Sequence, residues 1–334
     1  MRIPTRFFLS IFATFAVAFA IFEAALLGQF GSPSKGSAWT VRIIQRKTAA
    51  ARAVNLPKLL IVGGSGGLFG VKARQLESTL GIPAVNLCSH AGIGTACLLE
   101  LPRLVATHGD TVIIIPEYEL YDYGDTGRLD WGDAQYLDYM MAAEPARLRQ
   151  LSSVHFALLT FRVPAARILE GWLARLHPPA PRTFSSYHPY DPANVDDHGD
   201  MTGHRADRIP ARSLGPVGIS ETLAFGLTPR RSGMRDLRAF VEWAKMNGIR
   251  VLAAFPVLCE QPAYSAPATA RTIHEIQAFW RELGVPLLGQ FHDTLLPRRN
   301  FFDTEYHLTE EAAAFRTSDL ASQIAPYLRK QVGD

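Results

Sequence analysis

Residues 59–70 read LLIVGGSGGLFG, an apolar run followed by glycines that surround a single serine, Ser65. Large apolar and β-branched side chains favour a buried strand, and we expect one over residues 58–62. Glycine lets the backbone turn tightly and lets another group approach it closely. The stretch therefore predicts a strand that runs into a turn over residues 63–70, with the Ser65 hydroxyl at the end of the strand.

Three interpretations of Ser65 are open. A nucleophilic serine needs an exposed hydroxyl on a tight turn, with backbone N–H groups free to stabilise an oxyanion, and we favour this interpretation. A phosphate-binding loop is the second, but the stretch lacks the third glycine of the dinucleotide spacing and the Walker lysine. A purely structural turn is the third.

Strand-like and helix-like stretches alternate on both sides of this turn. We expect strands over residues 83–87, 111–115, 249–255 and 285–288, and helices over residues 71–80, 95–107, 234–247, 269–283 and 310–330. Short connections marked by glycine join them, which is typical of a mainly parallel sheet with helices on both faces. Residues 178–232 are rich in Pro, Gly, His and Asp, and we expect an irregular excursion over the site there.

The chain begins with an apolar segment. Residues 7–27 carry one charge, Glu23, and follow a short flank that contains Arg2 and Arg6. About 20 apolar residues span a bilayer as a helix, so we expect an uncleaved single-pass anchor, with a cleaved signal peptide and a soluble core helix as alternatives. The basic flank predicts a cytoplasmic N-terminus and an extracytoplasmic, periplasmic domain at the inner membrane.

This anchor suggests a division of the chain into three segments. We expect a membrane anchor or signal segment over residues 1–28, a linker and juxtamembrane helix over residues 29–56, and one α/β domain over residues 57–334. The 334 residues include 34 basic and 31 acidic side chains, and this near balance gives no electrostatic reason to expect nucleic-acid binding. The cysteines form no CxxC pair, and we expect all of them to be buried: Cys88, Cys97 and Cys259.

Polar groups follow the second and third predicted strands. Asn86 lies at the end of the second strand and Gly92 follows it, and Glu117 and Glu119 come after the third. The carboxyl ends of parallel strands meet at one edge of a sheet, so these groups should lie near Ser65. We expect Gly92 or Gly94 to offer an oxyanion N–H, Asn86 to offer a side-chain donor and Glu117 to bind substrate. An ordinary glycine turn is the alternative for residues 86–94, and a glycosidase pair of Glu117 and Glu119 is an alternative for the two acids.

A second motif stands near the end of the chain, where residues 300–311 read NFFDTEYHLTEE. Asp303 precedes His307 by four residues, and Thr309 is a plausible N-cap for the last helix. A catalytic histidine needs a carboxylate to fix its tautomer and stabilise its charged form. We therefore expect Asp303 and His307 to act with Ser65, and a capping loop with a surface histidine is the alternative.

A third polar cluster has metal-compatible side chains, in Asp197, His198, Asp200 and His204. Neither an HExxH motif nor a Cys/His framework accompanies it, so we interpret it as a solvated loop. We expect no metal and no organic cofactor.

With a serine turn after the first strand and an Asp/His pair before the last helix, the chain resembles the SGNH/GDSL hydrolase superfamily. More narrowly, it resembles the membrane-anchored members associated with cell-surface polysaccharide acylation. The resemblance covers roughly residues 58–330 and rests on two short motifs and the order of elements. It implies Ser65 as nucleophile, His307 as base, Asp303 as its orienting acid and Gly92 as oxyanion glycine, in a flavodoxin-like three-layer α/β/α domain.

The sequence departs from the pattern of that superfamily in three places. The residue before Ser65 is glycine where the family has aspartate, and the acid block is Asp-x-x-x-His, one residue longer than usual. Glu305 is therefore the fallback acid. Residues 116–119 read PEYE where the family has Gly-x-Asn-Asp, so the asparagine oxyanion donor is missing.

The sequence and the resemblance together predict a serine esterase or O-acyltransferase that acts on an acylated glycan of envelope or exported polysaccharide. Such an enzyme would lie beside a polysaccharide synthesis or export complex. The alternative is a non-catalytic scaffold or polysaccharide-binding protein with the same fold, which the missing asparagine favours. A nucleotide-binding protein that uses residues 63–70 is a weaker third hypothesis.

Overall fold

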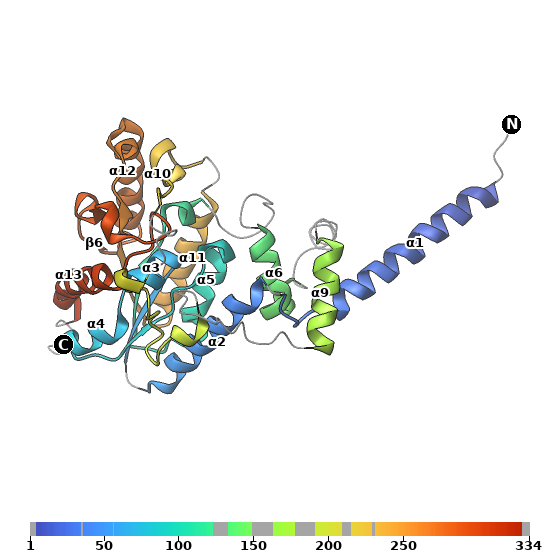
Figure 1. Cartoon of the computed structure of the whole chain (residues 1–334), viewed down its shortest axis with the longest axis horizontal. Coiled ribbons are helices and arrows are strands. Elements are labelled where there is room, and N and C mark those ends of the chain that lie inside the picture. The colour runs from blue at the N-terminus through green and yellow to red at the C-terminus, as the bar shows by residue number, and fades with distance from the viewer. Residues whose placement is uncertain are drawn as a thin grey trace. The chain divides into compact units, whose positions relative to one another are not determined.

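The computed structural model of the chain describes residues 5–34, 36–55, 57–122, 133–148, 163–177, 191–208, 215–228 and 231–328 (Figure 1). The chain divides into two compact units, Met1–Val41 with Leu129–Pro181 and Arg42–Arg128 with Arg182–Asp334. This division differs from the expected boundaries at residues 28 and 56. Residues 129–181 belong to the same unit as the N-terminal helix, because buried hydrogen bonds of Arg167 connect the two segments.

The first unit is helical and is organised around Arg167. Among the residues that the structure describes, its helices are α1 (Thr5–Gly28), α6 (Asp133–Ala143), α7 (Pro145–Leu148) and α9 (Ala165–Leu176). The buried Arg167 guanidinium donates to Gln29 Oε1 at 2.8 Å and to the Ser32 carbonyl at 3.0 Å, and it pairs with Asp138. A buried guanidinium needs such partners, so these bonds fix α9 and α6 to the segment that follows α1.

Helix α1 is long and apolar enough to cross a membrane, and very little of it is buried within the protein. A signal sequence near the N-terminus has the same properties. The helix extends over the whole apolar segment that the sequence predicts to be helical.

The second unit contains a five-stranded sheet in the order β2-β1-β3-β4-β6, in which every neighbouring pair is parallel. The strands are β1 (Leu59–Gly63), β2 (Ala84–Asn86), β3 (Thr111–Ile115), β4 (Arg250–Ala254) and β6 (Leu287–Leu288). All residues of β1, β2 and β3 are buried, as expected for strands of a parallel sheet that is covered on its faces. The predicted α/β class and mainly parallel sheet are confirmed, and β3 has the predicted bounds.

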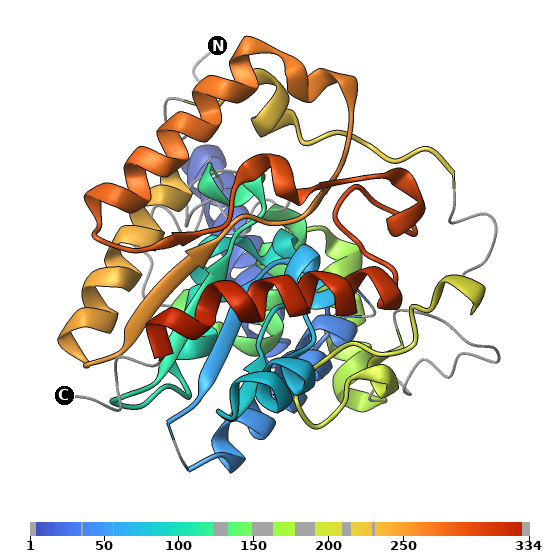
Figure 2. The ribbon, with the colours of Figure 1, turned by 90° about the vertical axis from the view of Figure 1, so that its left-hand side faces the viewer.

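Helices connect and cover these strands. They are α2 (Ser37–Ala53), α3 (Ser65–Gly70), α4 (Ala73–Leu80), α5 (Gly94–Arg103), α10 (Glu221–Phe225), α11 (Ser232–Met246), α12 (Pro267–Glu282) and α13 (Glu310–Leu328). Helix α13 packs against α3 and α4 (Figure 2), and α5 packs against α11 (Figure 1). The strands β5 (Leu258–Cys259) and β7 (Leu295–Leu296) form a separate parallel pair beside the sheet.

The predicted excursion over residues 178–232 is only partly described, since residues 178–190, 209–214 and 229–230 lie outside the described part. Its first described stretch packs on the sheet unit. The Asn86 N–H donates to the His198 carbonyl at 2.8 Å, and Asp200 accepts from the backbone N–H groups of Ala73 and Arg74 at 2.7 and 3.0 Å. Asp200 thus satisfies two of the unpaired donors at the start of α4.

Candidate active site

The sheet register brings the ends of β1 and β3 together. Gly63 is paired with Ile115, so the chain leaves the two strands side by side. Ser65 and Glu117 each stand two residues beyond this pair. Their proximity therefore follows directly from the parallel pairing of two buried strands.

Ser65 begins a short helix, α3, where the sequence analysis predicts a turn. Glycine is a poor helix former, and close contacts explain its presence here. A Cβ at Gly64 would lie 2.6 Å from Glu117 Oε2, and one at Gly67 would lie 2.4 Å from Cys88 Sγ. The glycines therefore admit neighbouring side chains into the start of α3, and the predicted turn over residues 63–70 is wrong in that respect.

The Ser65 hydroxyl is hydrogen-bonded to Glu117. Ser65 Oγ donates to Glu117 Oε1 at 3.1 Å, and the Gly66 backbone N–H donates to the same oxygen at 2.5 Å. The Gly66 N–H, a backbone donor beside the serine, is therefore already engaged by the Glu117 carboxyl group. The sequence placed Glu117 near the site but gave no sign of this direct bond.

Burial changes the protonation of Glu117, whose surface is only 4% exposed. Burial raises the pKa of Glu117 to about 7, and the nearby Glu119 adds to the rise. The Gly66 N–H, His307 and the Ser65 hydroxyl oppose it. Near neutral pH, this carboxyl group therefore exists in both its neutral and its charged form.

Asp303 and His307 form the expected pair. Asp303 Oδ1 lies 2.7 Å from His307 Nδ1, within hydrogen-bond distance. The extra residue between them is accommodated by a loop that is closed at its base by a β-bridge between Phe301 and Leu308. The Phe302 N–H donates to the His307 carbonyl at 3.0 Å inside this loop. Asp303 therefore reaches His307, and the fallback acid is not required.

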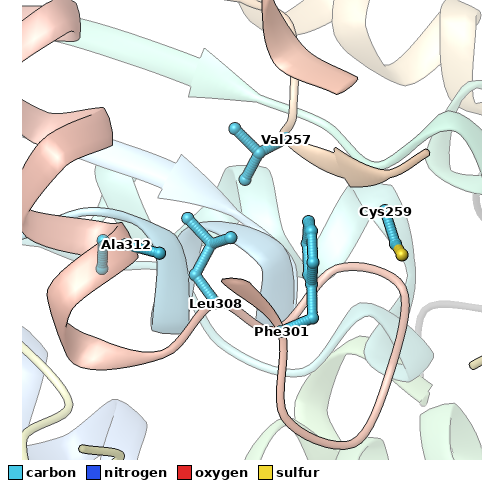
Figure 3. Close-up of a cluster of buried hydrophobic side chains, with 6 residues drawn as sticks. Val257, Cys259, Phe301, Leu308 and Ala312 are labelled. Atoms are coloured by element: carbon cyan, nitrogen blue, oxygen red, sulfur yellow. The ribbon is translucent and has the colours of Figure 1, made fainter. Parts of the chain in front are cut away.

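A buried apolar cluster holds the base of this loop in place (Figure 3). Its members come from the loop, from the segment after β4 and from α13: Val257, Cys259, Phe301, Leu308, Ala312 and Ala313. The Cys259 N–H also donates to the Glu305 carbonyl at 2.8 Å. The His307 backbone is thus attached to the core on both sides of the loop.

The His307 ring lies against the helix that Ser65 begins. The ring centroids of His307 and Phe69 are 4.7 Å apart, and a Cβ at Gly66 would lie 3.4 Å from Tyr306 Cβ. His307 is also close enough to Glu117 to lower its pKa. The structure therefore brings the serine segment and the Asp/His loop, 238 residues apart in sequence at Ser65 and Asp303 (303 − 65), to one edge of the sheet.

The two predicted backbone and amide donors are engaged elsewhere. The Gly92 N–H donates to His90 Nδ1 at 2.8 Å. The Asn86 side chain is fully buried and donates to the carbonyls of Gly67 and Val71, at 3.2 and 3.0 Å. Asn86 thus supports the turns around the site instead of facing a substrate, which differs from the expectation.

Glu119 supports the histidine loop. It accepts from Ser220 Oγ at 2.6 Å and from Tyr306 Oη at 2.8 Å. Burial raises the pKa of Glu119, and these two bonds oppose the rise. Since both carboxylate oxygens bind side chains of the protein, Glu119 is better explained as a structural partner of Tyr306 than as one of two glycosidase carboxylates.

The acidic side chains of residues 196–198 are already paired with a positively charged side chain, that of Arg74. Ligand atoms of Asp196, Asp197 and His198 lie within 4.8 Å of one another. The Arg74 guanidinium donates to Asp196 at 3.3 Å and to Asp197. His204 is buried away from this cluster, with its ring 5.3 Å from that of Phe69. Asp196, Asp197 and Arg74 fit an ion-paired surface loop, but Asp200 and His204 are buried, so the predicted solvated loop is wrong for those two residues.

Comparison of the chain with protein-family models and with curated proteins found no match. The functional argument therefore rests on the geometry around Ser65.

Proposed function

We propose that the chain is a serine esterase or O-acyltransferase of the SGNH/GDSL type, acting on acyl esters of envelope or exported polysaccharide. The observation that carries the proposal is the contact of His307, paired with Asp303, with α3, the helix that Ser65 begins at the carboxyl edge of the sheet. The strand order β2-β1-β3-β4-β6 supports the finer class, a flavodoxin-like three-layer fold.

The chemistry follows from the two groups. Asp303 holds the Nδ1 side of His307, which leaves Nε2 as the base. Ser65 Oγ attacks the ester carbonyl while His307 takes its proton, and the alcohol leaves with that proton as the acyl-enzyme forms. Water or a sugar hydroxyl then attacks the acyl-enzyme, loses its proton to His307 and releases Ser65.

Glu117 takes the place of the missing asparagine in this proposal. The negative oxygen that develops during attack needs donors, and a neutral carboxyl group can be one. The neutral form of Glu117 would donate to this oxygen through its O–H group. The Gly66 N–H, which donates to Glu117 in the structure, would turn to the oxyanion as a second donor. Ionised Glu117 would repel the oxyanion, so we expect the competent enzyme to carry Glu117 in its neutral form.

The apolar helix α1 supports a place at a membrane. We propose that α1 is an uncleaved anchor in the inner membrane, with the sheet unit on the periplasmic side, because basic residues precede it. Such an anchor would keep the enzyme beside a complex that synthesises or exports its glycan substrate.

The test is labelling of the full-length protein in detergent with a fluorophosphonate, followed by peptide mapping. We expect label on Ser65 and a labelling rate lower by roughly 10³-fold or more in His307→Ala, because the base is lost. Two controls are matched to these residues. Ser78, exposed on α4, should take no label, and His274→Ala, at an exposed position on α12, should leave the labelling of Ser65 unchanged. Label on Ser65 that is unchanged in His307→Ala would refute the proposed base.

A second candidate is a non-catalytic scaffold or polysaccharide-binding protein with this fold. The bonded state of Gly92 and Asn86 favours it, since both expected oxyanion donors are engaged within the protein. Folded protein in which Ser65 takes no label, while the glycan still binds, would support this candidate over the enzyme.

A further inference from the structure

The C-terminal end of α1 carries a second helix, α9. The Trp172 indole N–H donates to the Ala25 carbonyl at 2.9 Å, and Arg175 donates to the Gly28 carbonyl. A Cβ at Gly28 would lie 2.4 Å from Trp172 Cζ2, so only glycine admits the ring there. These contacts hold α9 at the last turn of α1 (Figure 1).

The orientation of α9 about its own axis is also fixed. Arg167, Ile168 and Gly171 are buried on one face. A Cβ at Gly171 would lie 2.3 Å from Gln29 Oε1, which shows how closely this face approaches the segment after α1. Because the buried guanidinium is bonded to Gln29 and Ser32, the helix cannot rotate without breaking those bonds.

The opposite face of α9 is apolar and exposed. Leu169, Leu173 and Leu176 are 60%, 50% and 70% exposed, and Trp172 beside them is 38% exposed. Residues three and four positions apart share one side of a helix, so the three leucines form a continuous stripe. Single exposed leucines are ordinary, but such a stripe indicates a surface that is covered by something apolar.

We propose that this stripe, Leu169, Trp172, Leu173 and Leu176, lies in the interfacial region of the membrane that α1 crosses. This inference rests on the proposed anchor. The end of a membrane-spanning helix lies at the boundary between acyl chains and headgroups, and α9 is bonded to that end.

The dimensions and side chains of α9 fit this position. Its 12 residues span about 18 Å, too short to cross a core of about 30 Å but suitable for a helix that lies along the surface. Tryptophan is enriched at membrane interfaces, where its ring meets acyl chains and its N–H finds a polar partner. The Arg175 guanidinium lies 6.0 Å from the Trp172 ring centroid and donates to the Gly28 carbonyl, so in this position it would also face the lipid phosphates.

The inference can be tested in liposomes that contain the full chain. Cysteine is introduced at Leu173, Leu176 or Glu170 and labelled with nitrobenzoxadiazole, and quenching by phosphatidylcholine with a doxyl group at acyl carbon 5 is measured. The native cysteines are buried, so the unsubstituted chain gives the background. Phe15→Cys, in an exposed position of α1, reports whether the anchor is in the bilayer.

We expect the Leu173 and Leu176 labels to be quenched roughly threefold more than the Glu170 label, because an interfacial helix buries its apolar face by about 5–10 Å. Gly28→Val should displace Trp172 and lower quenching at position 173 by about half or more, whereas Leu27→Val, beside it, should not.

Other outcomes overturn the inference in distinguishable ways. Quenching at Phe15 without quenching at positions 173 and 176 would place α9 in water and leave the anchor intact. Blue-shifted label that lipid does not quench would show that protein, such as a second copy, covers the stripe. Absence of quenching at all positions would remove both the anchor and the membrane contact of α9.

Discussion

Replacing Glu117 with glutamine separates the charge of this side chain from its shape. Glutamine has nearly the same volume, and its carbonyl oxygen can accept the same bonds from Ser65 and Gly66. The substitution removes the ability to ionise and replaces the second carboxyl oxygen by an amide NH2 group of similar size. Any change in stability with pH that belongs to Glu117 should therefore disappear in Glu117→Gln.

The size of this change follows from the pKa. Burial raises the pKa of Glu117 from 4.5 to about 7, a difference of about 2.5 units, or about 3 kcal/mol at 1.36 kcal/mol per unit. The folded protein therefore binds the proton more tightly than the unfolded chain does. This contribution to stability is fully present below pH 4.5 and is lost as the pH rises towards 7.

The assay is denaturant unfolding of the full chain in detergent, followed by circular dichroism at pH 5 and pH 8. At pH 8 we expect Glu117→Gln to exceed the wild type in free energy of unfolding by up to about 3 kcal/mol, with a much smaller difference at pH 5. The exposed Glu242→Gln, on α11, should change stability by less than about 0.5 kcal/mol. Equal or lower stability of Glu117→Gln at pH 8 would refute the argument.

Two further predictions concern the buried Lys47 on α2, whose ammonium group donates to the Asn86 carbonyl at 2.9 Å, and Gly67. Burial lowers the pKa of Lys47 from 10.5 to about 8, so the free energy of unfolding of the wild type should rise between pH 8 and 10.5. Lys47→Met should remove this rise. In a denaturation series at pH 7, this variant should be more stable than the wild type by up to about 3 kcal/mol. Gly67→Ala should lower the free energy of unfolding by about 1–3 kcal/mol, because its Cβ meets Cys88 Sγ. Cys88→Ala in the same chain should restore most of that loss, and no restoration would contradict the steric explanation.

The sheet was predictable because its strands carry a strong local signal. The run at residues 111–115 is β-branched throughout and buried on both faces, and its bounds match the prediction. The helical start of α3 was not predictable, since glycine-rich sequence favours a turn and the helix depends on neighbours that admit no Cβ. Cys88 and Glu117 are those neighbours, and both are distant in sequence.

The candidate site was predictable only in part. The Asp303–His307 pair was expected from its position before the last helix, and the loop provides the distance that spacing alone could not establish. The bond between Ser65 and Glu117 depends on the register of two strands, which a single sequence does not define. The union of residues 129–181 with the N-terminal helix depends on buried bonds of Arg167, for which composition gives no signal.

The bridge between Phe301 and Leu308 makes the position of His307 independent of the number of residues that separate it from its acid. Residues 303–306 form an arc whose two ends are anchored in the core, and within it the Tyr306 hydroxyl and the Glu305 carbonyl bind Glu119 and Cys259. Residues could therefore be added near Thr304 without moving the imidazole. Motif searches that count residues between acid and histidine would pass over such a pair.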